Sequence, residues 1–175
     1  KGVKAEPRGP DPVRNSPKPV EAGRRGKTDT HGLPWGGGAL LEDDWLFIED
    51  LIRDNKVDSV LEFGSGLSTV LFSDRGVKVQ SYETMPSWIE KVKMIKPDCD
   101  VRLWDGKQLK ITGQFDFAFV DGPSGPANRW DAMRLAAAHA KVVVVHDGNT
   151  EIEKQHMKEN FTEGFIACGK GGRRC

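Results

Sequence analysis

Apolar and polar residues follow one another along the chain in blocks that predict alternating strands and helices. Short, nearly continuous apolar or β-branched runs are typical of parallel strands buried on both faces. Such runs predict strands at 57–63, 77–82, 101–104, 115–120 and 142–145. Helical spacing of apolar residues and polar, helix-favouring stretches predict helices at 41–52, 86–94, 129–139 and 151–160, with a further helix capped by Ser68 or Thr69. Alternating strands and helices indicate an α/β fold, a Rossmann-like, doubly wound, mostly parallel sheet with helices on both faces.

The first part of the chain differs from the rest in composition. Residues 1–32 are rich in proline, glycine and basic residues and have almost no apolar side chains, so we predict a flexible tail. Residues 33–175 are predicted to form one domain, with a further strand at 161–168. Only residues 169–175 follow this strand. If one more strand completes the sheet, either that strand is very short or the fragment ends within it.

Composition excludes several classes of protein. Basic and acidic residues both number 26, which argues against a dedicated nucleic-acid site, and 37% of residues are hydrophobic, enough for a core. No apolar run reaches the ~20 residues of a membrane span. Cysteines at 99, 168 and 175 lack metal-binding spacing and suggest reduced thiols, hence a cytoplasmic location. The chain begins at Lys1 and not at methionine, which suggests a fragment and leaves an upstream targeting segment open.

A glycine-containing turn follows the first predicted strand and precedes a helix. Gly64-Ser65-Gly66 has two residues without a Cβ, so backbone can approach a ligand there, and the helix start behind it offers free N–H groups. Glu83 lies at the end of the next strand, where an acidic side chain can accept hydrogen bonds from ribose hydroxyls. These residues predict a site for a nucleoside-containing cofactor.

The order of these motifs resembles the class I S-adenosylmethionine-dependent methyltransferases. The resemblance rests on Leu61 to Gly66, then Glu83, then the run from Phe115 to Pro123, and it covers about residues 40 to 170. It implies S-adenosylmethionine as cofactor, with Asp121 beside the transferring methyl group. It also implies that Trp104 or Asp105 contacts the adenine ring, although a simple turn at the strand end is an alternative for both.

Two further residues have open interpretations. Glu62 is either a polar group near the ammonium of the cofactor or an acceptor that fixes the loop. The glycine-rich segment with Trp35 either forms part of a lid or pins the tail to the core. The expected cofactor-binding residues are Glu62, Gly64, Ser65, Gly66, Glu83, Trp104, Asp105 and Asp121.

The candidate catalytic residues follow the last two predicted parallel strands. Asp121 ends one strand, and His146 and Asp147 follow the neighbouring strand, so they should meet at one edge of the sheet. In metal-dependent O-methyltransferases that the chain resembles, acids in these places bind Mg²⁺, which makes Asp121 and Asp147 candidate ligands. Gly148 stands where the catechol enzymes have asparagine, so a metal-free route with His146 or Asp121 as the base stays open, as does a structural role of the acids.

The expected function is methyl transfer to a hydroxyl group of a small molecule or sugar. Two alternatives are an NAD-dependent oxidoreductase and a non-catalytic, nucleoside-binding interaction domain. The first is less favoured because Thr69 replaces the third glycine of the usual dinucleotide fingerprint. The acceptor and the oligomeric state do not follow from the sequence.

Overall fold

The structure is a computed structural model, and it describes residues 27–36, 40–123, 126–148 and 151–161. Its elements follow in the order α1 (Glu42–Asp54), β1 (Ser59–Phe63), α2 (Leu67–Asp74), β2 (Lys78–Glu83), α3 (Pro86–Ile95), β3 (Asp100–Leu103), β4 (Phe115–Val120), α4 (Pro126–His139), β5 (Ala140–Val145) and α5 (Glu151–Asn160). Each predicted strand and helix in this part of the chain is therefore present, with ends shifted by a few residues.

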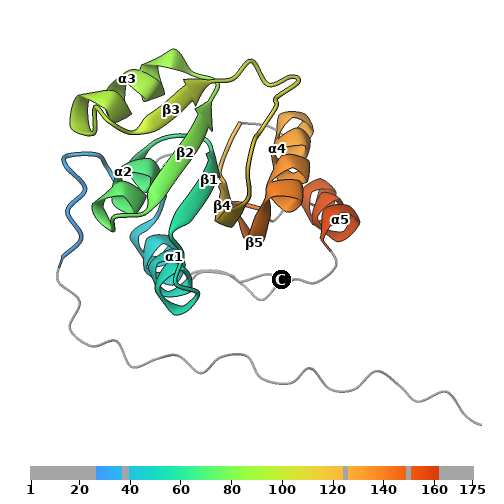
Figure 1. Cartoon of the computed structure of the whole chain (residues 1–175), viewed down its shortest axis with the longest axis horizontal. Helices are drawn as coiled ribbons and strands as arrows, with labels where there is room; N and C mark the ends of the chain where they lie inside the picture. Colours follow the sequence, from blue (N-terminus) through green and yellow to red (C-terminus); the bar gives the residue numbers. More distant parts are fainter. Residues whose placement is uncertain (1–26, 37–39, 124–125, 149–150, 162–175) are drawn as a thin grey trace, which may run out of the picture.

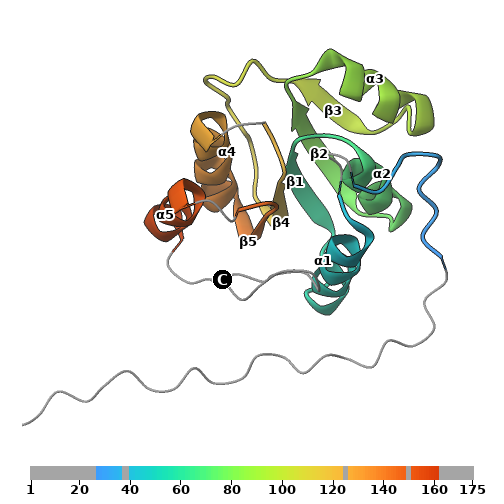
Figure 2. The same cartoon turned by 180° about the vertical axis from the view of Figure 1, so that it is seen from behind.

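The strands form one parallel sheet in the order β3-β2-β1-β4-β5. The central position of β1, between β2 and β4, is clear from the reverse view (Figure 2). The register aligns Phe63 with Tyr82 on one side and with Val120 on the other, and Val120 with Val145. The residues that follow these four strands therefore reach the same edge of the sheet.

Alternate side chains of the central strands feed two cores, one on each face of the sheet. On one face, Val60 and Phe117 pack with residues of α1 and α2. On the other face, Leu61 and Ala118 pack with α4, and Met157 of α5 joins this cluster. The ribbon shows the same division, with α4 and α5 together beside β4 and β5 (Figure 1). The predicted doubly wound α/β fold is confirmed.

Two local predictions are wrong. Leu41, where the apolar spacing of the predicted helix at 41–52 begins, precedes α1 and is 53% exposed, so the buried stripe of this helix consists of Trp45, Ile48 and Ile52. The expected helix caps Ser68 and Thr69 lie inside α2, because the helix starts at Leu67 with Gly66 as its N-cap.

The N-terminal end of the described chain touches the domain. Thr28 is buried, and Nε2 of His31 lies 2.8 Å from Oδ2 of Asp74 at the end of α2. Leu33 and Trp35 pack against the core, which favours the pinning interpretation of this segment. Most of the expected tail, residues 1–26, lies outside the described residues, so the boundary of the domain stays a prediction.

Two predictions concern residues near the C-terminal end. Residues 162–168 of the expected strand at 161–168 and the cysteines at 168 and 175 lie outside the described residues, whereas Cys99 is buried and free. Among the helices that the structure describes, none is long and apolar enough to cross a membrane.

Candidate functional site

A pocket lies at the carboxyl edge of the sheet, where β1 and β4 are neighbours. The chain leaves β1 toward β2 and leaves β4 toward β5, so the two following loops diverge and open a crevice between them. Loops after β1, β2 and β4 line the pocket together with α2, α3 and Leu40, which lies two residues before α1. The lining residues are Leu40, Gly64, Ser65, Gly66, Leu67, Ser68, Glu83, Thr84, Met85, Trp88, Asp121, Gly122 and Pro123.

Glu83 is held rigidly at the wall of this pocket. Its Oε1 accepts hydrogen bonds from the backbone N–H groups of Thr84 and Met85, both at 2.7 Å. Its Oε2 accepts one from Ser65 N at 2.8 Å, which ties the loop after β2 to the loop after β1. Ser65 Oγ also donates to Oε2, but at 3.4 Å, a long contact that the hydroxyl of a ligand can replace.

Glu62 lies beneath the pocket and does not line it. The side chain is fully buried, and its two oxygens accept hydrogen bonds from Ser68 Oγ at 2.6 Å and Thr69 Oγ1 at 2.5 Å. Thr69 Oγ1 in turn accepts the N–H of Gly66 at 2.9 Å. These contacts favour the loop-fixing interpretation of Glu62. Burial raises the pKa of Glu62 to about 7, although the hydroxyl hydrogen bonds oppose this shift.

Trp104 and Asp105 also stay outside the pocket lining. Trp104 is buried against Phe63 and donates its indole N–H to Lys107 O at 3.0 Å. Asp105 is exposed and accepts the N–H of Lys107 at 3.0 Å. Both contacts belong to a turn after β3, so they favour the structural alternative, and a contact of either residue with adenine stays a prediction.

Trp88 lines the pocket, although its position in a helix that packs on the sheet suggests a purely core residue. It lies in the first turn of α3, and Lys91 Nζ is 4.0 Å from the centre of its ring. The sequence offers no local signal for this role, because an aromatic residue at that spacing is typical of a core position.

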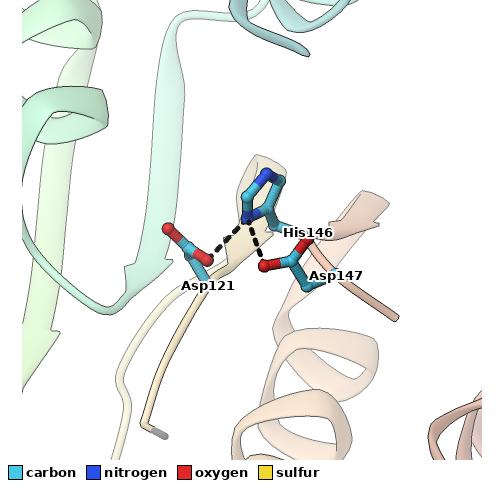
Figure 3. A group of neighbouring side chains, drawn as sticks. All are labelled: Asp121, His146 and Asp147. Carbon is cyan, nitrogen blue, oxygen red and sulfur yellow. Dashed lines mark hydrogen bonds and ion pairs between the residues drawn. The ribbon is translucent and has the colours of Figure 1, made fainter. Parts of the chain in front are cut away.

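The three candidate catalytic side chains gather beside the pocket (Figure 3). His146 Nδ1 lies 2.8 Å from Oδ1 of Asp121 and 3.7 Å from Oδ2 of Asp147. One donor atom from each residue fits within 4.8 Å of the others, a spacing suited to a shared cation. Asp121 lines the pocket, whereas the side chain of Asp147 is 74% exposed.

A fourth residue of this cluster, Asp44, comes from α1. Its Oδ2 lies 3.2 Å from His146 Nε2, so both ring nitrogens of the histidine face carboxylates. Burial lowers the pKa of His146, but hydrogen bonding to Asp121 and Asp44 and the charges of Asp121 and Asp147 raise it to about 9. Sequence reasoning missed Asp44, because it is one of several acids in the first turn of α1 and 102 residues separate it from His146.

Neither a family model nor a curated protein sequence matches the chain. Solved structures do. A protein from Thermoplasma acidophilum has a TM-score of 0.53 at 16% identity, with 67% of each chain covered. An amino pentose methyltransferase from Micromonospora echinaspora, solved with S-adenosylmethionine bound, has a TM-score of 0.54 at 18% identity, with 78% of this chain and 57% of that chain covered.

A third similar structure is a Klebsiella pneumoniae protein named as a proposed O-methyltransferase. Its TM-score is 0.52 at 14% identity, with 73% of this chain and 69% of that chain covered. The chain thus spans between 57% and 69% of the length of these proteins. At such identities the comparisons establish a shared fold, and the chemistry has to be argued from the site.

Proposed function

Because the chain has the fold of the class I S-adenosylmethionine-dependent methyltransferases, we propose that it is a methyltransferase that uses this cofactor. The observation that carries the proposal is the rigid placement of Glu83 at the wall of the pocket between β1 and β4. The comparisons favour neither alternative, the NAD-dependent oxidoreductase or the non-catalytic domain.

The pocket has features that fit S-adenosylmethionine. Oε2 of Glu83 can accept a ribose hydroxyl in place of its long, 3.4 Å contact with Ser65 Oγ. The backbone at Ser65 and Gly66 is held by Glu83 and Thr69. Leu40, Met85 and Trp88 supply apolar wall area beside these polar groups. The cofactor, when bound, supplies a methyl group on a sulfonium centre.

We propose a hydroxyl group of a small molecule or sugar as the acceptor. In methyl transfer to a hydroxyl, the new bond joins oxygen to the methyl carbon, the sulfur–methyl bond breaks, and the hydroxyl proton goes to a base. Asp121 is the best-placed base, because its carboxylate lines the pocket while both ring nitrogens of His146 face carboxylates. His146 then orients Asp121 through the 2.8 Å hydrogen bond.

The same residues fit a divalent cation. Asp121 and Asp147 present carboxylate oxygens to a common point, and the exposure of Asp147 leaves room for water ligands, an arrangement that suits Mg²⁺. Asp121 and Asp147 would hold the ion. A cation at this point would lower the pKa of the acceptor hydroxyl and so make its deprotonation easier.

The test is calorimetric titration of the protein with S-adenosylhomocysteine and, separately, with NAD. We expect binding of the homocysteine compound, lost in Glu83→Ala and retained in Glu90→Ala, which removes an exposed glutamate of α3. Binding of NAD alone would support the oxidoreductase. Binding of neither compound would overturn the proposed function.

A further inference from the structure

Arg129 of α4 is buried beneath the loops that follow β4 and β5. Its side chain is 10% exposed. Nη1 donates a hydrogen bond to the backbone oxygen of His146 at 2.8 Å, and Nη2 donates one to the backbone oxygen of Asp121 at 3.1 Å. One guanidinium group therefore bridges the first residues beyond two neighbouring strands.

Glu153 of α5 fixes this guanidinium group from the other side. Its Oε1 lies 3.1 Å from Arg129 Nη1, and its side chain is only 5% exposed. A buried charge without a partner is strongly destabilising, so the ion pair allows Arg129 to stay at this depth. The planar, fixed fork of arginine suits contacts to several acceptors at once, which a lysine ammonium cannot reproduce.

Backbone hydrogen bonds between β4 and β5 hold the two strand ends together only as far as Val120 and His146. The last hydrogen bond between them runs from His146 N to Val120 O at 2.9 Å. The next carbonyl groups in the direction of the pocket, those of Asp121 and His146, are the ones that Arg129 binds. Arg129 thus continues the connection between β4 and β5 where their ladder ends.

We propose that Arg129 is a positioning residue that sets the separation of Asp121 and His146. Their side chains form a 2.8 Å hydrogen bond, and a small movement of either backbone would break it. The consequence for methyl transfer rests on the function proposed above, since only then is Asp121 a base or metal ligand. Glu83 and Ser65 belong to other loops, so the hydrogen bonds that hold Glu83 should not depend on Arg129.

The structure offers a matched control at the opposite end of the same two strands. Lys141 of β5 lies 2.7 Å from Oδ1 of Asp116 of β4, so this ion pair also links the two strands, but far from the pocket. Lys141→Met therefore removes a cross-strand link without touching the loops that carry Asp121 and His146.

The experiment compares the wild type, Arg129→Met and Lys141→Met by NMR of the histidine rings and by titration with S-adenosylhomocysteine. The imidazole Nδ1 proton of His146, assigned with His146→Gln, should give a low-field signal in the wild type and in Lys141→Met. Arg129→Met should lose this signal. The dissociation constant of S-adenosylhomocysteine should change by less than about threefold in Lys141→Met, because its site is distant from the pocket.

Two results would overturn the proposal: an unchanged low-field signal in Arg129→Met, or its loss in Lys141→Met as well. If Arg129→Met does not fold, Arg129→Lys replaces it. A single ammonium cannot span both carbonyl groups, so the signal should weaken, and an unchanged signal contradicts the proposal. If the wild type does not bind S-adenosylhomocysteine, the proposed function fails, whereas the NMR comparison still decides the role of Arg129.

Discussion

The backbone of Gly64 lies directly against the backbone of Gly122. A Cβ atom on Gly64 would be 2.7 Å from Gly122 N, and a Cβ atom on Gly122 would be 2.8 Å from Gly64 Cα. Gly64 also has a φ of +93°, a conformation that side chains other than glycine rarely adopt. The first glycine of the motif after β1 is therefore required by its contact with the loop after β4, independently of any ligand.

This contact predicts that the two glycines of the motif respond differently to substitution. Gly64→Ala should destabilise the protein by about 2 kcal/mol or more, because it combines an unfavourable φ with a backbone clash. Gly66→Ala should cost less than about 1 kcal/mol, because its Cβ would meet only the ring of Trp88 at 3.9 Å, an ordinary contact distance. Urea unfolding of both variants measures the difference.

Gly122→Ala provides a second variant for the same contact. It should also lose stability through this clash, but less than Gly64→Ala, since Gly122 does not have the positive φ of Gly64. Equal stability losses in Gly64→Ala and Gly66→Ala would show that the approach to Gly122 is not what requires glycine at position 64.

The sequence predicted the parts of the site that depend on strand order. Glu83 and Asp121 were identified because each follows a strand with a clear apolar pattern, and parallel strands place their carboxyl ends at one edge. Contacts between distant elements leave no such pattern. Asp44 and Arg129 lie on helices whose surfaces carry other charged residues, and only the packing of α1 and α4 brings them to His146.

Motif position alone was a weaker guide to direct contact with a ligand. Glu62 precedes the glycine turn, but its strand turns the side chain into the core, where hydroxyl groups of α2 bind it. Trp104, the expected last residue of the third strand, directly follows β3, and its indole ring packs on Phe63. Alternation along a strand decides which face a side chain takes, and a short apolar run does not reveal it.

Glu62 predicts a specific dependence of stability on pH. Its pKa in the folded protein, about 7, lies above the ordinary value of 4.5, so the folded state binds the proton more tightly than the unfolded state. The resulting stabilisation is complete below pH 4.5 and is lost as the pH rises through 7. Urea unfolding at pH 5 and pH 8 should show a smaller loss of stability in Glu62→Gln than in the wild type. Identical pH dependence in the two proteins would contradict a buried, proton-binding Glu62.

A divalent cation between Asp121 and Asp147 predicts binding of Mn²⁺, which can replace Mg²⁺ at oxygen-rich sites and is visible by electron paramagnetic resonance. Asp147→Asn should weaken Mn²⁺ binding by about tenfold or more, because it removes a charged ligand. Asparagine tolerates the positive φ of 53° at this position, so the fold should persist. Asp105→Asn, which changes an exposed acid after β3, is the control. Equal affinity in both variants would exclude Asp147 as a ligand.

Asp74 connects the segment before α1 to the domain. Its Oδ2 lies 2.8 Å from His31 Nε2 and its Oδ1 lies 2.5 Å from Lys96 Nζ. Partial burial alone would raise the pKa of Asp74, but hydrogen bonds from Lys96 and His31 lower it below its ordinary value of 3.8. The contribution of Asp74 to stability is therefore present above pH 3.8 and is lost as the pH falls through its lower, folded-state value.

Removal of this carboxylate should loosen the segment locally while the global fold persists. Asp74→Asn should cost less than about 1 kcal/mol of global stability, because the ion pairs are partly exposed. Amide hydrogen exchange, followed by mass spectrometry, should accelerate in residues 28–36, because His31 links this segment to Asp74 of α2. Asp54→Asn is the control, since Asp54 pairs with Arg53 on the surface of α1. Unchanged exchange in Asp74→Asn would mean that packing of Leu33 and Trp35 suffices to hold the segment.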